Sequence, residues 1–328
     1  MTKLIKCDRF KQMKKTILLF LWLFFGLTSS SQAYWIWTPQ TGRWINPKYS
    51  VKGSPAEQLE SGKSLFEAKE YKKAEQEFIK LIHYYRKSKE AAEAQFYIGR
   101  CMEATNRPYQ AFLAYQKVIE KYPFSERQGE IVERQYQIGE RLLENAKFTF
   151  WDSVSGKEYS AVEILKKVVA NAPYGKYAAI AQYKIGLFLK NSGMYTEARA
   201  EFDKVINEYP QSEWVKATKY QIALCDAKAA PKPAYDQSTT GNAVQEFEEF
   251  VKTYPDADLS ANAKKHISQL KGKEAENNYN IARFYEKQKA WEAARIYYNI
   301  VVDDYKDTSW SVKAIERLGI LGKKGKLK

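Results

Sequence analysis

Small and apolar residues recur along the chain at fixed intervals. A small residue opens each unit, an alanine follows twelve residues later in four of six units, and a proline follows that alanine by twelve residues in the middle four. The small residues are Gly62, Gly99, Gly139, Gly186, Ala223 and Ala282, the alanines are Ala74, Ala111, Ala161, Ala198, Ala243 and Ala294, and the prolines are Pro123, Pro173, Pro210 and Pro255. The pattern predicts pairs of antiparallel helices that approach closely at the small residues and end before the proline.

A column of large apolar residues supports this prediction. Four residues after each alanine stand Phe78, Tyr115, Leu165, Phe202, Phe247 and Tyr298. The undisturbed period is 37 residues, as from Gly62 to Gly99. This spacing resembles the tetratricopeptide repeat family. The resemblance implies an all-α solenoid of about six helix pairs over residues 55–321, in which each pair covers the next, with a capping helix from Ser311.

Three departures from the plain repeat have structural meaning. Insertions at 148–160 and 229–243 lengthen the turn inside repeats three and five, and they are either partner contacts or solvated spacers. From Pro255 to Ala282 the chain is fourteen residues longer than the plain repeat. We therefore expect repeat six to begin with an extended helix.

The N-terminus has the features of an exported protein. A basic start, the apolar run from Ile17 to Leu27 and a small-residue exit predict a signal peptide over residues 1–33, with an uncleaved anchor as the alternative. Met13 is an alternative start to Met1. The formal charge of +14 includes a surplus of +5 in the first 33 residues, which leaves +9 after cleavage at Ala33. The basic tail at 322–328 is either solvated or a contact for an anionic surface.

Residues 34–54 predict a tryptophan-rich β-hairpin. Trp35, Trp37 and Trp44 flank a segment with Pro39 and Gly42, residues that favour a tight turn. A lone hairpin is only marginally stable in water, so the three rings must bury against something. The candidates are the open first repeat, which they would cap, a partner protein, or a membrane interface.

The chemistry-bearing residues do not predict an enzyme. Cys101 and Cys225 hold equivalent positions in repeats two and five, which favours separate buried thiols over a disulfide, and no cysteine directly follows the apolar run for lipid attachment. His83 and His266 are the only two histidines, and neither has ligands at metal-binding spacing. We expect no catalytic residue, cofactor or metal site, and no binding of nucleic acid or of a small-molecule substrate.

A second aromatic column is a candidate binding site. Three residues before the small position, repeats two to six carry Phe96, Tyr136, Tyr183, Tyr220 and Tyr279. In the tetratricopeptide family this column lines the concave groove. The rings would either grip an extended peptide or pack between successive first helices of the repeats.

The last third of the chain has a more specific resemblance. Asp236-Gln237 with Thr240 precedes a helix that ends at Tyr254-Pro255, and Ala282-x-Phe284-Tyr285 follows in the next repeat. These runs resemble the BamD-type outer-membrane assembly lipoprotein family, although that family's lipidated cysteine is missing and six repeats replace five.

The resemblance implies a non-enzymatic periplasmic scaffold associated with the outer membrane. It would dock on the periplasmic domains of a barrel-inserting partner and hold unfolded barrel precursors in its groove. The alternative is a periplasmic repeat adaptor for cell-wall synthesis or cell division.

Overall fold

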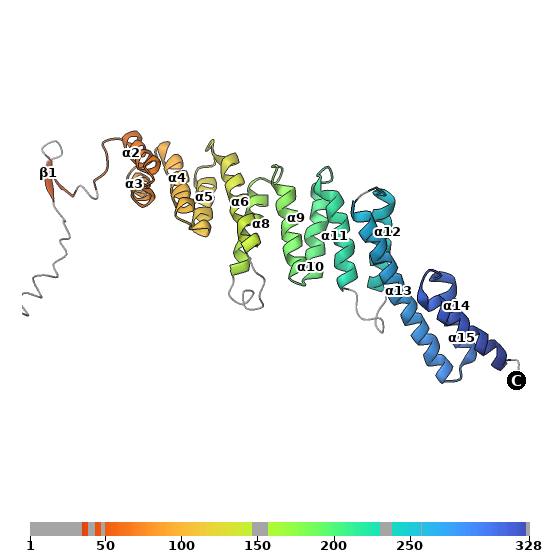
Figure 1. The fold of residues 1–328 in the computed structure, drawn as a ribbon. Helices are drawn as coiled ribbons and strands as arrows, with labels where there is room; N and C mark the ends of the chain where they lie inside the picture. The colour runs from red at the N-terminus through yellow and green to blue at the C-terminus, as the bar shows by residue number, and fades with distance from the viewer. Residues whose placement is uncertain are drawn as a thin grey trace, which may run out of the picture. The chain divides into compact units, whose positions relative to one another are not determined.

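The computed structural model describes residues 35–38, 43–46, 50–145, 157–229, 238–256 and 258–325. Within these ranges two short strands precede thirteen helices (Figure 1). The chain divides into two compact units, and the boundary in the sequence lies between Ala94 and Gln95.

The first unit contains the predicted hairpin and the first helix pair. Strand β1 (Ile36–Thr38) pairs antiparallel with β2 (Arg43–Ile45), with Trp37 opposite Trp44, so the hairpin is confirmed. The turn between the strands lies outside the described residues. Ser54 caps helix α2 (Pro55–Glu67), because its hydroxyl accepts a hydrogen bond from the backbone N–H of Glu57. Helix α2 packs on α3 (Tyr71–Tyr84).

The second unit contains the remaining repeats. Its helices are α4 (Glu90–Ala104, which crosses the boundary), α5 (Pro108–Lys121), α6 (Gln128–Asn145), α8 (Lys157–Asn171), α9 (Ala178–Asn191), α10 (Tyr195–Glu208), α11 (Trp214–Ala229), α12 (Ser238–Thr253), α13 (Asp258–Lys287), α14 (Trp291–Asp304) and α15 (Ser309–Gly325). From α5 to α15 consecutive helices contact one another, and α9, α10 and α11 lie side by side in Figure 1. The six predicted helix pairs and the final capping helix are therefore present.

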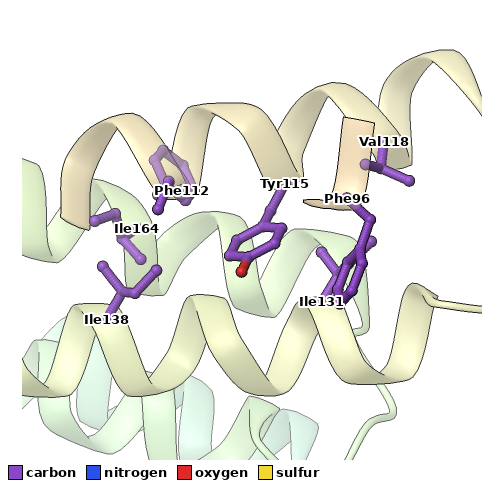
Figure 2. Packing of buried hydrophobic residues seen from close by; sticks show 8 residues of the cluster. Phe96, Phe112, Tyr115, Val118, Ile131, Ile138 and Ile164 are labelled. Carbon is purple, nitrogen blue, oxygen red and sulfur yellow. The ribbon is translucent and has the colours of Figure 1, made fainter. Parts of the chain in front are cut away.

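The two helices of a pair meet where a small residue faces a large ring. A Cβ atom placed on Gly186 would lie 2.5 Å from Cε1 of Phe202, and Gly62 and Gly99 face Phe78 and Tyr115 in the same way. The six alanines of the pattern are all buried, as are the six large residues four positions later. Figure 2 shows one such core, in which Tyr115 lies among side chains from neighbouring helices. The missing side chain is what lets each ring fill the space between its helices.

The turns inside the repeats share one backbone conformation. Seven residues after the small position, Lys69, Asn106, Gly193 and Lys289 have positive φ angles between 57° and 79°. The next residue donates its N–H to the carbonyl five residues earlier, as Met194 does to Leu189 at 3.0 Å. This is the Schellman ending of a helix, which reverses the chain within a few residues. Only one of the four positions is glycine, so the sequence alone did not indicate this shared helix ending.

A polar column also recurs, and sequence reasoning missed it. Four residues before the small position, repeats one to four carry a buried glutamine: Gln58, Gln95, Gln135 and Gln182. Gln95 Nε2 donates to the carbonyl of Ala114 in the second helix of its pair at 3.1 Å, and Gln58 and Gln182 make the equivalent bond. The buried amide is thereby hydrogen-bonded, and the bond sets the position of one helix along the axis of the other.

Two repeats have a tyrosine in place of phenylalanine in the ring column. The Tyr298 hydroxyl donates to Glu286 Oε2 at 2.8 Å, and Arg317 of α15 pairs with the same carboxylate. Tyr115 makes the same arrangement with Glu103 and, from the next helix, Arg134. The repeats with an apolar ring-column residue carry no carboxylate at the position of Glu286. Each added hydroxyl is therefore matched by a charged partner.

The structure sharpens the predicted boundaries. Helix α13 spans 30 residues, which confirms the extended helix at the start of repeat six. Helix α12 begins at Ser238, so the last six residues of the predicted insertion at 229–243 are helical. Helix α8 begins at Lys157, inside the predicted insertion at 148–160, and α15 continues to Gly325, inside the predicted tail. The signal-peptide segment lies outside the described residues.

Replacing Gly186 by alanine tests the contact between the paired helices. The added methyl group would collide with the ring of Phe202, and overpacking of this kind costs about 1–3 kcal/mol of unfolding free energy. Gly272 in α13 is the matched control because a Cβ there meets nothing within 4 Å. Its replacement by alanine should stabilise by about 0.5–1 kcal/mol. Urea denaturation measures both, and equal effects would refute the proposed role of the small residue.

The Glu286 cluster predicts a specific pH dependence. Burial opposes ionisation, but hydrogen bonds from Arg317 and Tyr298 outweigh it and lower the pKa of Glu286. A lowered pKa in the folded state stabilises folding above the unfolded pKa of about 4.3, and this stabilisation is lost as pH falls through the folded value.

Glu286→Gln should therefore cost about 1–2 kcal/mol at neutral pH, and the difference from the unmodified protein should shrink near pH 3. Exposed Glu292 is the control, and Glu292→Gln should change little at either pH. A cost for Glu286→Gln that is the same at both pH values in denaturation experiments would contradict this assignment.

Candidate protein-binding surfaces

The three tryptophans of the hairpin are exposed. Trp35 is 60% exposed, Trp37 48% and Trp44 62%, and the rings of Trp37 and Trp44 meet edge to face with centroids 5.8 Å apart. The first of the three sequence alternatives, burial as a cap on the first repeat, is therefore wrong for this structure. The cross-strand pair orders the two rings against each other and leaves their outer surfaces open, which leaves a partner or a membrane as the alternatives.

The segment after the hairpin is tied to the first helix pair. The backbone N–H of Lys52 donates to Gln58 Oε1 at 2.9 Å, and the hydroxyl of Tyr85 donates to the carbonyl of Lys52 at 2.6 Å. Ser50 N–H also donates to the carbonyl of Asn46 at 2.9 Å. The two described parts of the connection between the hairpin and α2, Asn46 and the segment from Ser50, are therefore both hydrogen-bonded.

The predicted groove column is buried. Phe96, Tyr136, Tyr183, Tyr220 and Tyr279 are between 1% and 9% exposed. Four of these rings reach the next repeat: Tyr136 stacks on Tyr177, Tyr183 lies on Trp214, Tyr220 lies beside His266, and Tyr279 lies on Trp310. In this structure the rings pack between successive first helices, the second of the two roles considered from sequence. Peptide binding by the column stays a prediction.

Phe96 has a different environment from the tyrosines of its column. The guanidinium carbons of Arg100, Arg127 and Arg134 lie 5.9, 5.0 and 5.9 Å from its ring centroid. Arg127 and Arg134 also pair with Glu130 at 2.9 Å. The ring therefore lies under a cluster of paired cations, in which cation–π attraction adds to the ion pairs.

Two exposed aromatic residues lie in equivalent turns and were missed from sequence. Phe124 and Tyr174 directly follow the repeat prolines Pro123 and Pro173, and each is 98% exposed. Their exposure could have been predicted from sequence, because an aromatic residue in the turn that ends a repeat has no helix face to pack against. They are the most exposed large apolar side chains of the described residues.

The last three helices also expose apolar side chains. Phe284 on α13, Ile296 on α14 and, on α15, Val312, Ile315 and Ile320 are between 41% and 60% exposed. Val312 and Ile315 are three residues apart and therefore lie on one face of α15. The end of a repeat array ordinarily has a polar outer surface. An apolar face on the final helix is therefore a candidate contact surface.

Three helices of the second unit line a polar pocket. Arg199, Asp226, Asn242, Gln245, Glu246 and Glu249 line it on α10, α11 and α12. Arg199 pairs with Asp226 and, at 3.2 Å, with Glu246. Burial raises the pKa of neighbouring Asp203. The ion pairs bind the helices together, so the pocket has a structural explanation.

The two described cysteines and His266 have packing roles. Cys101 and Cys225 are both buried with no disulfide between them, as predicted, and burial raises the pKa of the Cys225 thiol to about 11. A thiol with such a pKa is unreactive. His266 stacks on Phe247 with centroids 5.2 Å apart, and burial lowers its pKa. His83 is exposed on α3.

The described residues contain no group of three or more histidine, cysteine, aspartate or glutamate side chains placed to hold a metal ion. None of the helices in the described ranges has the length and apolar character to cross a bilayer.

Comparison with known families gives a specific match. Residues 151–324, more than half of the chain, match the YfiO family model, described as outer membrane lipoprotein. Residues 93–125 match a tetratricopeptide repeat model.

Curated relatives and a solved structure are also similar. The outer membrane protein assembly factor BamD of Xylella fastidiosa (strain 9a5c) is 24% identical over 164 residues, which are 47% of this chain and 56% of that protein. BamD of Caulobacter vibrioides is 24% identical over 163 residues, 50% of this chain and 53% of that protein. The alignments thus span about half the length of the relatives.

Among solved structures, the C-terminal part of a tetratricopeptide protein from Cytophaga hutchinsonii is 17% identical and has a TM-score of 0.36. The match covers 80% of this chain and 87% of that one.

Replacing Trp35, Trp37 and Trp44 together by serine tests whether these rings cap the first repeat. The rings are exposed, and substitutions of exposed side chains usually change the unfolding free energy by less than about 0.5 kcal/mol each. The melting temperature followed by circular dichroism should therefore match that of the unmodified chain. A marked fall would restore the capping role. Phe202→Ala is the positive control, because this ring is fully buried and its truncation should cost about 3–5 kcal/mol.

Proposed function

The chain belongs to the YfiO family of outer membrane lipoproteins, and on this premise we propose that it is a non-enzymatic scaffold in the assembly of outer-membrane β-barrel proteins. The observation that carries the proposal is the family match over residues 151–324, together with relatives named as assembly factors. The matched segment comprises most of the second unit and includes its last three helices.

We place the docking surface for the barrel-inserting partner in the last two repeats and the capping helix α15 that follows them. The run from Asp236 to Tyr305 carries the family-specific sequence and includes exposed Phe284 on α13, and α15, which follows the run, exposes Val312 and Ile315. Exposed apolar side chains on a helix face are suited to contact with another folded domain. The partner's periplasmic domains would cover this face.

Unfolded barrel precursors are the proposed second class of partner. The side chains of the column from Phe96 to Tyr279 are at most 9% exposed, so the repeat backbone and neighbouring polar side chains would supply most of the contacts. Repeat arrays bind extended segments over several units at once, which suits a chain that has not yet folded. The proposed location is the periplasm, at the outer membrane.

A pull-down from gently solubilised envelopes tests the proposed function. Tagged residues 34–328 should recover a large barrel protein with repeated periplasmic domains. The double variant Val312→Ser and Ile315→Ser should reduce that recovery by at least about tenfold, since losing two buried apolar contacts exceeds 1.4 kcal/mol. Both side chains are exposed, so the variant should keep its fold.

Ile79→Ser is the matched control. Ile79 is exposed on α3, outside the segment matched by the family model, and its replacement should leave recovery unchanged. Recovery of cell-wall synthesis or division proteins in place of a barrel protein would favour the adaptor function. Equal recovery by the double variant and the unmodified protein would reject α15 as the docking surface.

A further inference from the structure

The tryptophan hairpin exposes three rings, two of which share one face. Trp37 lies in β1, and Trp35 directly precedes that strand. Trp44 is the cross-strand partner of Trp37, so these two rings lie on the same side. All three rings are about half exposed or more, and Ile36 in the same strand is 47% exposed. The hairpin is therefore a small apolar surface with nothing packed over it in the described structure.

The composition of this face suits a bilayer interface. Tryptophan combines a large apolar ring with one N–H donor, and it concentrates where hydrocarbon meets water. The rings project from a two-stranded hairpin that is too small to bury them itself. Insertion into the headgroup region would cover the rings while the donors remain hydrogen-bonded.

The charge around the hairpin points to an anionic surface. From Arg9 to Ala56 the sequence contains no aspartate or glutamate, and the segment from Tyr34 to Ala56 carries Arg43, Lys48 and Lys52. The rest of the exported chain mixes both signs. Basic residues beside an amphipathic surface are attracted by anionic lipid headgroups, and this attraction adds to the burial of the rings.

We propose that Trp35, Trp37 and Trp44 insert into the interfacial region of a bilayer that contains anionic lipid. These side chains would then provide a membrane contact in the first unit. The hydrogen bonds of Lys52 to Gln58 and Tyr85 hold the segment from Ser50 to Lys52, which follows the hairpin in sequence, against the first helix pair. The inference concerns lipid alone and does not depend on the proposed assembly partners.

Vesicle sedimentation with purified residues 34–328 tests this inference. The protein should sediment with vesicles of phosphatidylethanolamine and phosphatidylglycerol, and less with vesicles of phosphatidylcholine alone. The triple variant Trp35→Ser, Trp37→Ser and Trp44→Ser should lose at least about tenfold in partitioning, because three large rings leave the interface. Brominated lipids should quench tryptophan emission in the unmodified protein and much less in the variant.

The matched control removes exposed aromatic residues elsewhere. Phe124→Ser with Tyr174→Ser deletes two rings that are each 98% exposed and should leave vesicle binding unchanged. Circular dichroism melting verifies that both variants are folded.

Two results would overturn the inference. One is an unmodified protein that stays in the supernatant with both kinds of vesicle. The other is equal binding by the triple variant. If the protein fails to bind lipid but its hairpin crosslinks to an envelope protein or to a second copy, that molecule covers the face instead. The pull-down that tests the assembly function uses residues of α15, so the two proposals can fail separately.

Discussion

The contact between a small residue in one helix and a ring in its partner is the interaction on which the rest of the structure depends. Gly62, Gly99 and Gly186 lack the side chain that would collide with Phe78, Tyr115 and Phe202. This absence allows the helices to approach closely enough for a buried glutamine to reach a carbonyl of the partner helix. It also favours tight turns, which the Schellman endings provide. Packing, polar pairing and turn geometry thus follow from one steric condition.

The same packing determines which residues remain available for binding. A repeat array buries its aromatic columns between successive helices, so the tyrosines of these columns are not available for binding. The residues left over are those outside the repeated positions, namely the hairpin tryptophans, the aromatic residues after two prolines, and the faces of the last helices. In this protein the surfaces available for binding arise where the repeat pattern is interrupted or ends.

The function inferred for the chain agrees with this division. A scaffold needs rigid spacing between contact surfaces more than it needs reactive groups, and the buried thiols and the stacked histidine have packing roles. The Tyr–Glu–Arg clusters at repeats two and six stiffen the array by joining three helices at one carboxylate each. Contacts with a barrel-inserting partner and with lipid would then use different ends of the chain.

The sequence by itself determined the repeat, the order of the helix pairs, the long helix of repeat six and the hairpin. Each of these follows from local spacing or turn chemistry, which is written along the chain. Only the tertiary structure decided which aromatic side chains are buried and which are exposed. A tyrosine three residues before a small position suits a groove or a helix interface equally, and only the packing of the next repeat buries it. The exposure of Trp35, Trp37 and Trp44 was undecided for the same reason, because burial depends on what lies opposite a side chain and not on the side chain itself.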